Sequence, residues 1–286
     1  MRSFANSIGK PEQGCINEDA VIARENIIAV SDGAGGGGLF AERWSAYLLN
    51  HLPATPISSA DELDAWIGDI WEPYYNQCET DARILGGLSL DKFYDEGSFA
   101  TLVAVWGLSD TECQWMSFGD SVAFHYNYRT KRLEHSFGTL ADFDKPPYLI
   151  NCKDELLKEG FRKGTFHLDS DSVVFVVSDA LAHYILMMYE IANIDRFKHE
   201  LDAAESKYSK NSNYIKVARA IREVKFEKDV INKLTNTVGH LTNFRRHVQS
   251  LIRKGLIAYD DYSLAMFYKK QNNGTDKTLN PKATSS

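Results

Sequence analysis

The chain has 286 residues, 44% of them hydrophobic, and a formal net charge of −7 at pH 7. That length can bury a sizeable core, either as one large domain or as two small ones. No segment approaches the roughly 18 consecutive apolar residues of a membrane-spanning helix, and the N-terminus lacks the apolar core of a signal peptide. We therefore expect a soluble, cytoplasmic protein with no membrane partner.

Charge and cysteine usage narrow the class of protein further. Residues 196–254 contain 14 Lys and Arg against 6 Asp and Glu, an excess of +8, whereas the remainder has 18 against 33, or −15. This pattern describes an acidic body with a basic segment, and by itself it does not indicate a nucleic-acid partner. Reduced structural thiols are favoured over a metal or redox site, because no Cys-x-x-Cys pair occurs among Cys15, Cys78, Cys113 and Cys152.

The first acidic pair, Glu18-Asp19, stands just before the apolar run at 21–23. Adjacent acids are typical of a solvated turn, and on a strand they would face opposite sides. The next apolar run, 27–30, predicts a buried strand that delivers Asp32 to its end. If these two strands pair, acids from both lie at one edge of a sheet.

A run of small residues follows Asp32. Residues 33–38 are glycines and one alanine, so the backbone there can turn sharply and approach a ligand closely. Apolar residues at helical spacing then predict a helix from Leu39. A second helix is predicted from a capping box at 59–62, and Pro73 is expected to break or kink it before 75–85 resumes.

From Gly97 the chain becomes rich in β-forming residues. Three runs, 97–107, 112–118 and 122–128, predict an antiparallel meander. Asp120 lies in the turn between the last two runs, where it is either a simple turn former or a site residue. Residues 138–172 are interpreted as loop with short irregular elements.

The C-terminal half repeats the opening pattern. An apolar strand at 172–177 delivers Asp179 to its end, and a helix is predicted at 180–189. His183, one turn beyond Asp179, is either a packed or solvated histidine or an assistant in catalysis. A long helical region follows, with an amphipathic helix that stops near Gly255, and Asp260 then precedes a last strand at 262–268.

Strand edges or ends therefore carry four separate aspartates, namely Asp19, Asp32, Asp179 and Asp260. Carboxylates that converge without a matching Lys or Arg repel each other, and divalent cations relieve that repulsion. All-oxygen ligation suits Mg²⁺ or Mn²⁺, and two such ions lower the pKa of a bridging water and hold a phosphoryl group. The pattern favours metal-assisted hydrolysis of a phosphate ester, and unrelated Asp-ended strands are the alternative.

Six short motifs in a fixed order carry a family resemblance. They are Asn17-Glu18-Asp19, Asp32-Gly33-Ala34-Gly35-Gly36, Gly97-Ser98-Phe99-Ala100, Phe118-Gly119-Asp120-Ser121, Ser178-Asp179 and Asp260-Asp261-Tyr262-Ser263. Together they resemble the metal-dependent protein phosphatases of the 2C type, in their bacterial form, from about Gly9 to Tyr268. Each motif is short, and their order gives the resemblance its specificity.

The resemblance implies an α+β fold: a four-layer α-β-β-α sandwich of two antiparallel sheets flanked by helices, with the metal site at one end. It implies catalytic roles for Asp32 and Asp179, with Asp32 bridging two Mg²⁺ or Mn²⁺ ions. The metal ligands that it implies are Glu18, Asp19, Asp32, the Gly33 carbonyl, Asp179 and Asp260, with Asp120 holding a third, weaker ion. Gly97 and Ser98 match a structural turn.

The implied reaction is attack of a metal-bridging hydroxide on phosphoserine or phosphothreonine of a protein substrate. We expect a monomer with no nucleic-acid partner. Residues 1–270 would form one phosphatase-like domain with a basic helical insertion at about 190–255, and 271–286 a disordered tail. The insertion's basic residues either cover a solvated helix face or steer acidic substrates; they include Lys216, Arg219, Arg222 and Lys225.

The chain also departs from the family pattern. Many members carry a phosphate-gripping arginine shortly before the Glu-Asp pair, but no arginine lies between Arg2 and Arg24, and Gly14 stands in that region. Ala34 replaces a histidine that some members use, Ala180 replaces a usual glycine, and the substrate-binding residues stay unassigned. The alternative function is a phosphatase-fold binding or regulatory module with little or no turnover. A P-loop nucleotide site is disfavoured because no Lys-Ser or Lys-Thr follows the glycines.

Overall fold

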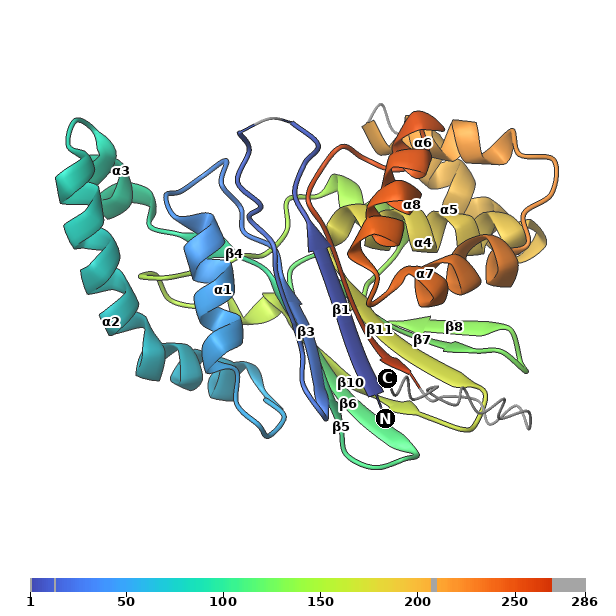
Figure 1. Cartoon of the computed structure of the whole chain (residues 1–286), viewed down its shortest axis with the longest axis horizontal. Helices are drawn as coiled ribbons and strands as arrows, with labels where there is room; N and C mark the ends of the chain where they lie inside the picture. The colour runs from blue at the N-terminus through green and yellow to red at the C-terminus, as the bar shows by residue number, and fades with distance from the viewer. Residues whose placement is uncertain (1, 13, 207–209, 269–286) are drawn as a thin grey trace, which may run out of the picture.

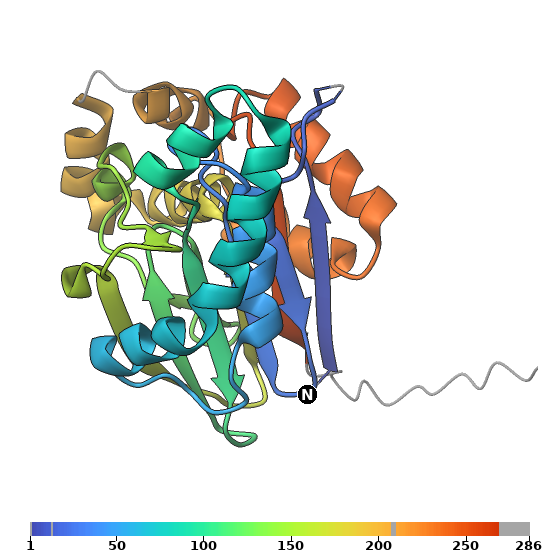
Figure 2. The ribbon, with the colours of Figure 1, turned by 90° about the vertical axis from the view of Figure 1, so that its left-hand side faces the viewer.

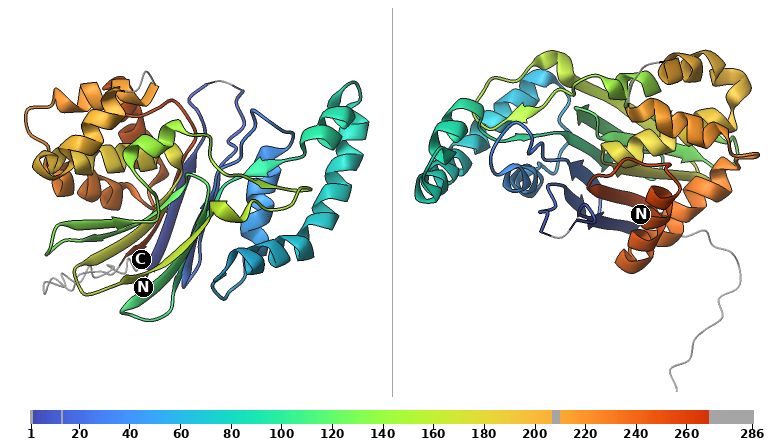
Figure 3. Two further views of the ribbon diagram at one scale, coloured as in Figure 1. Left: turned by 180° about the vertical axis from the view of Figure 1, so that it is seen from behind. Right: turned by 90° about the horizontal axis from the view of Figure 1, so that it is seen from above.

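Two five-stranded antiparallel sheets pack face to face, and helices cover the outer face of each sheet (Figure 1). The computed structural model describes residues 2–12, 14–206 and 210–268. The view from above in Figure 3 separates the layers in the order helices, sheet, sheet, helices. The predicted α-β-β-α sandwich is therefore confirmed, whereas the predicted tail, 271–286, lies outside the described residues.

The strands of each sheet come from distant parts of the chain. The first sheet has the order β1 (Arg2–Ile8), β12 (Tyr262–Tyr268), β11 (Ser172–Val177), β7 (Val122–Asn127) and β8 (Arg132–His135). The second has the order β10 (Phe161–His167), β6 (Glu112–Phe118), β5 (Leu102–Gly107), β3 (Ile27–Ser31) and β2 (Ala20–Ala23). A short pair, β4 (Phe99–Ala100) and β9 (Ile150–Asn151), lies apart from both.

Central strands are apolar on both faces because both faces are covered. In β3, Ile28 and Val30 face the other sheet, while Ile27 and Ala29 pack under helices. Successive side chains of a strand point to opposite sides, so a strand between two apolar layers reads as a continuous apolar run. This explains why 27–30 and 172–177 were recognisable as buried strands from sequence.

The second sheet is covered by α1 (Ala41–His51), α2 (Ala60–Leu85) and α3 (Ser89–Glu96), which Figure 2 shows in front of its strands. The sequence predicted that Pro73 would break or kink the second helix; no break occurs, and α2 continues through that position. Pro73 lacks the amide that would bond within the helix. The carbonyl that Pro73 leaves without a helical partner is that of Asp69, four residues earlier. The Tyr47 hydroxyl donates to the adjacent Ile70 carbonyl at 2.9 Å.

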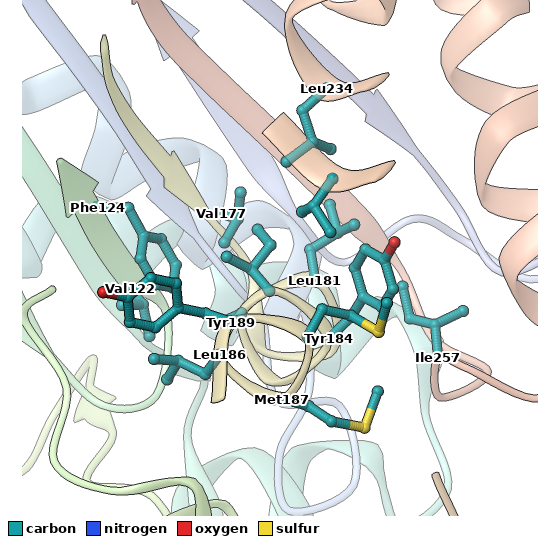
Figure 4. Packing of buried hydrophobic residues seen from close by; sticks show 14 of the residues in the cluster. Val122, Phe124, Val177, Leu181, Tyr184, Leu186, Met187, Tyr189, Leu234 and Ile257 are labelled. Atoms are coloured by element: carbon teal, nitrogen blue, oxygen red, sulfur yellow. The ribbon is translucent and has the colours of Figure 1, made fainter. Parts of the chain in front are cut away.

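The first sheet is covered by α4 (Asp179–Ala192), and further helices pack around it. These are α5 (Ile194–Ser206), α6 (Lys210–Arg219), the π-helical turn η3 (Glu227–Ile231), α7 (Asn232–Thr237) and α8 (Leu241–Arg253). Figure 4 shows α4 side chains such as Leu181 and Tyr189 among residues of β7, β11 and α7. Two short 3₁₀ turns, η1 (Leu140–Asp144) and η2 (Lys158–Gly160), complete the described elements.

The predicted meander at 97–128 is wrong in its last strand. The first two runs pair as β5 and β6, but β7 belongs to the other sheet, where it pairs with β11 and β8. The three-residue connection carries the chain across the sandwich, with Gly119 at φ 101°. A local turn signal is the same for a hairpin and for a crossover between sheets, so the sequence could not separate them.

Four further strands went unrecognised in the sequence: the short β8 and β9, and the longer β1 and β10. Residues 2–8 form β1, and the segment interpreted as loop at 138–172 contains the seven-residue β10. Both are edge strands that have little buried apolar surface, so their hydrophobic pattern is weak. Among the described helices, none combines the length and apolar character needed to cross a membrane.

Candidate active site

Sheet topology brings the acidic strand ends to one end of the sandwich. In the β2–β3 pair, Ala20 lies opposite Ser31, so Asp19 and Asp32 extend from the same edge. In the β11–β12 pair, Val177 lies opposite Leu264, so the chain leaves β11 toward Asp179 where it enters β12 from Asp260. In an antiparallel pair, one strand begins at the edge of the sheet where its neighbour ends. Acids that precede one strand therefore lie near acids that follow the neighbouring strand.

The backbone of Asp32 is fixed by the neighbouring strand. Its amide donates to the Thr101 hydroxyl at 3.1 Å, and the Thr101 amide donates to the Asp32 carbonyl at 2.8 Å. Thr101 Oγ1 and Ser121 Oγ also share a hydrogen bond of 2.8 Å. The turn that carries Asp120 is thereby tied to the end of β3, so two predicted site residues share one polar support.

The glycines after Asp32 allow another acidic segment to approach closely. The Gly33 amide donates to the Glu18 carbonyl at 3.1 Å, and a Cβ at Gly33 would lie 2.7 Å from that same oxygen. A Cβ at Gly35 would collide with the Glu18 carboxylate. The small residues are therefore required by the packing of residue 18 against this turn.

Gly97 and Ser98 hold the far end of the glycine turn. The Leu39 amide donates to the Gly97 carbonyl at 2.9 Å, and the Ser98 hydroxyl donates to the Leu39 carbonyl at 2.5 Å. Gly97 has φ 73°, a conformation that favours glycine. These contacts agree with a structural turn at these two positions.

The innermost carboxylate belongs to Asp19. Its side chain is buried, and neither carboxylate oxygen has a hydrogen bond of good geometry within the described residues. Burial raises the pKa of Asp19 to about 7, although the nearby hydroxyls of Ser263 and Ser178 oppose that shift. A buried carboxylate without donors is unfavourable unless a proton or a cation joins it.

The charged forms of Asp32 and Asp179 are also disfavoured, although Asp179 Oδ1 accepts from the Ala180 amide at 2.5 Å. Burial raises the pKa of each well above its usual range, and the charges of neighbouring aspartates raise it further. For Asp32 the neighbour with the largest effect is Asp19, and for Asp179 it is Asp120. The structure thus places the predicted aspartates close enough to repel one another, as the sequence pattern required.

Asp120 and Asp260 stand on the outer side of this group. Burial raises the pKa of Asp120 to about 6, Asp260 adds to the shift, and Arg162 opposes it. Within residues 2–12, 14–206 and 210–268, no three His, Cys, Asp or Glu side chains are grouped as a closed set of metal ligands. The aspartates are therefore electrostatic neighbours at the sheet edge without forming a ready-made cage.

Several solved structures that are similar to this chain are phosphatases. One is a bacterial serine phosphatase, with 14% identity and TM-score 0.50 over 93% of this chain and 96% of that chain. Another is the catalytic domain of the serine threonine protein phosphatase PstP in complex with two manganese ions, with 15% identity and TM-score 0.50 over 93% of this chain and 96% of that one. At the level of sequence, no family model and no curated protein matches the chain.

The chain has the PP2C-type phosphatase fold. Within this fold, sequence reasoning missed Lys10, a cation at the carboxylates. Its Nζ lies 3.1 Å from Asp260 Oδ1 and 3.8 Å from Glu18 Oε2. Burial alone would lower the pKa of Lys10, but the acidic neighbours outweigh burial and raise it. The expectation of carboxylates without any matching Lys or Arg is therefore wrong at the outer edge of the group.

Asp261 is a second residue whose role the sequence did not reveal. It is buried, its Oδ1 accepts from the Lys10 amide at 2.7 Å, and its Oδ2 accepts from the Glu18 amide at 2.8 Å. One carboxylate thereby joins both ends of the β1–β2 connection to the start of β12. The sequence does show two adjacent aspartates before the last strand. It does not show which of them, Asp260 or Asp261, has the structural role.

Arg162, at the start of β10, is a second basic side chain near the candidate site. Its guanidinium carbon lies 4.9 Å from the ring centre of Phe137, and its Nη1 is buried without a hydrogen-bond partner in the described part of the chain. Its charge lowers the pKa of Asp120. The sequence gave no hint of this residue because β10 itself was not recognised.

Two other positions that the sequence analysis considered, Gly14 and His183, do not have the environment of a catalytic or phosphate-binding residue. Gly14 has φ 89°, so an arginine placed there would be strained. His183 is buried, with its ring edge-on to Phe143 and Tyr214, and burial lowers its pKa to about 4. The packed interpretation of this histidine therefore fits the structure, and assistance in catalysis does not.

Proposed function

We propose that this chain is a metal-dependent protein phosphatase that hydrolyses phosphoserine and phosphothreonine in proteins. The observation that carries the proposal is the buried carboxylate of Asp19, whose two oxygens have no hydrogen-bond partner within the described residues, beside Asp32 and Asp179. Such a group is costly for a fold to keep unless cations join it. The PP2C-type fold, found in solved serine phosphatases, supports the same reading.

The donor set suits hard divalent cations. Carboxylate and carbonyl oxygens are the ligands that Mg²⁺ and Mn²⁺ prefer, and the manganese complex of PstP shows that this fold can hold two such ions. We propose that Asp32 and Asp179 are central to their binding. The further ligands that we propose are Glu18, Asp19, the Gly33 carbonyl and Asp260, with Asp120 for a third ion.

When bound, these cations would supply Lewis-acid stabilisation of a phosphoryl group and activation of water. The chain's own residues hold the proposed metal ligands in place. Thr101 fixes the Asp32 backbone, and Asp261 fixes the segment that carries Glu18. We propose that Lys10 and Arg162 contact the substrate phosphate, because Lys10 lies beside Asp260 and the charge of Arg162 acts on Asp120. They would replace the arginine that many relatives carry elsewhere.

The proposal places these residues in one catalytic domain, 1–270, with a basic helical insertion at about 190–255. The direct test is hydrolysis of p-nitrophenyl phosphate and of a phosphothreonine peptide by the purified chain. We expect turnover with Mn²⁺ or Mg²⁺, none after chelation, and recovery when metal is restored. Turnover that persists in chelator, or none with any divalent metal, would refute the proposal.

A second candidate is a phosphatase-fold binding or regulatory module with little turnover. The contact between Lys10 and Asp260 favours it, because a lysine beside a carboxylate can compensate charge in the place of a metal ion. Calorimetric binding measurements together with an assay of phosphate release distinguish the enzyme from the binding module. An enzyme should bind Mn²⁺ and turn over substrate, whereas a module of this kind should bind a phosphopeptide without releasing phosphate.

A further inference from the structure

A cavity of about 490 Å³ lies between helix α8 and the segment that runs on from the end of β1, of which residues 8–12, Cys15 and Asn17 line it. Its floor is apolar and includes Val248 and Tyr262, both buried. Its polar wall includes Lys10, Arg245 and Glu12. We call this feature the α8 cavity, and its size is suitable for a side chain of a bound peptide.

Helix α8 brings positive charge that nothing in the described chain neutralises. Residues 241–255 contain no Asp or Glu, but they contain four basic residues: Arg245, Arg246, Arg253 and Lys254. None of the four forms an ion pair within residues 2–12, 14–206 and 210–268. By contrast, Arg219 of α6 lies 2.6 Å from Asp202 and 2.7 Å from Glu205, so its charge is already used. Within the described chain, four of the unpaired charges of the helical region are therefore on α8 and its C-terminal cap, and exposed Arg222 is another.

The α8 cavity adjoins the candidate active site. Lys10 lines the cavity and also places its Nζ 3.1 Å from Asp260. Asn17, which lines the cavity too, directly precedes Glu18. A peptide whose phosphorylated residue reached the site aspartates would therefore have neighbouring residues at the cavity mouth.

We propose that the α8 cavity binds an acidic side chain that flanks the phosphorylated residue of a protein substrate, with Arg245 as its ion-pair partner. This inference rests on the proposed phosphatase function and adds a substrate class to it. Arg245 is exposed and without a hydrogen bond or ion pair in the described chain, and a guanidinium over an apolar floor suits a carboxylate. Glu12 on the wall, and the aspartates beyond Lys10, oppose a polyanion such as nucleic acid.

The test compares two phosphopeptides that differ only in glutamate or glutamine at positions beside the phosphothreonine. For the wild-type chain, kcat/KM should be higher for the acidic peptide. Arg245→Glu should lower kcat/KM for the acidic peptide by about tenfold, the usual worth of a hydrogen-bonded charge pair. The same substitution should leave the neutral peptide and p-nitrophenyl phosphate unchanged, because Arg245 is outside the reacting group.

Arg222→Glu is the matched control, because it makes the same charge change on an exposed arginine that does not line the cavity. It should leave the preference between the peptides intact. Glu12→Gln should increase the preference, since it removes the carboxylate from the cavity wall. Equal losses for both peptides, equal effects of the two arginine substitutions, or competition by a DNA oligonucleotide as strong as by the acidic peptide would overturn the inference.

Failure of the proposed function gives a separate result. If the wild-type chain hydrolyses no phosphate ester, peptide binding is measured by fluorescence anisotropy instead. A difference between the acidic and neutral peptides that disappears in Arg245→Glu would still support the cavity as a binding site. Equal affinity of both peptides for the wild-type chain would refute it, whatever the outcome for catalysis.

Discussion

Two groups of carboxylates lie at the same end of the sandwich and are compensated in different ways. Asp19 is buried and Asp32 and Asp179 are half-buried, and the pKa values of all three are raised by burial and by neighbouring aspartates. Asp260 has the ammonium of Lys10, and Asp261 accepts two backbone amides. Of the inner group, Asp179 accepts one backbone amide, that of Ala180 at 2.5 Å, but none of the three pairs with a Lys or Arg within the described residues. The difference identifies the inner group as the place where an external cation would be most stabilising.

The largest expected effect comes from neutralising an inner carboxylate. Asp32→Asn and Asp179→Asn should each lower phosphatase kcat by at least on the order of a thousandfold, because ligands of the proposed cations are lost. The measurement is hydrolysis of p-nitrophenyl phosphate in saturating Mn²⁺. Asp202→Asn, on an exposed helix, is the control and should retain activity. Near-normal turnover in either inner variant would remove that residue from the proposed site.

The pH dependence of stability should also distinguish the inner group. In the folded state the pKa of Asp19 is about 7, whereas an unfolded aspartate titrates near 4. Folding therefore favours the protonated form, so this group's contribution is fully present below about pH 4 and is lost as pH rises through about 7. In the metal-free protein, Asp19→Asn should exceed the wild type in free energy of unfolding by about 2–4 kcal/mol at pH 8.

That difference should shrink as pH falls toward 5, because the wild-type carboxyl then holds its proton. Urea unfolding of both proteins in chelator measures it. Histidines and distant carboxylates titrate alike in both proteins, so their contribution cancels, whereas Asp32 and Asp179, whose pKa values Asp19 raises, add to the difference in the same direction. A difference that stays constant from pH 5 to 8 would contradict the raised pKa.

Stability should change in opposite directions for the two groups. Asp261→Asn keeps one acceptor oxygen but turns an amide group toward a backbone N–H, so it should lower the free energy of unfolding by about 1–3 kcal/mol. Asp179→Asn removes a charge that its neighbours repel, so the metal-free protein should become more stable. Denaturant unfolding in chelator checks both signs. If both substitutions destabilise equally, the contrast between the groups is wrong.

The smallest expected effect comes from replacing Lys10, the lysine that pairs with the outer carboxylates. Lys10→Met removes the cation that compensates Asp260 and Glu18, so the affinity for Mn²⁺ should rise by about tenfold. Calorimetric titration with Mn²⁺ measures it. Lys158→Met is the control, since Lys158 pairs with the exposed Asp61 on another face. Weaker Mn²⁺ binding in Lys10→Met would show that the lysine orders the site more than it competes with the metal.

Local signals in the sequence were sufficient for part of this site. Buried strands are continuous apolar runs, and Asp32 and Asp179 follow such runs directly, so both could be placed at strand ends. The glycines after Asp32 indicated a close approach of another segment, and the Glu18 carboxylate is what approaches. The fold class followed from ordered motifs whose spacing reflects the same strand ends.

Only the tertiary structure decided the rest, because the deciding contacts are not local. The Lys10 amide and its acceptor Asp261 are 251 positions apart, and no pattern within a short window connects them. The crossing of β7 to the facing sheet and the unrecognised β1 and β10 depend on strand pairings of the same kind. Sequence thus determined which segments become buried strands, since burial of apolar side chains is a local pattern. Pairing across the sandwich determined which charges meet, and with them the lysine at the site and the cavity beside α8.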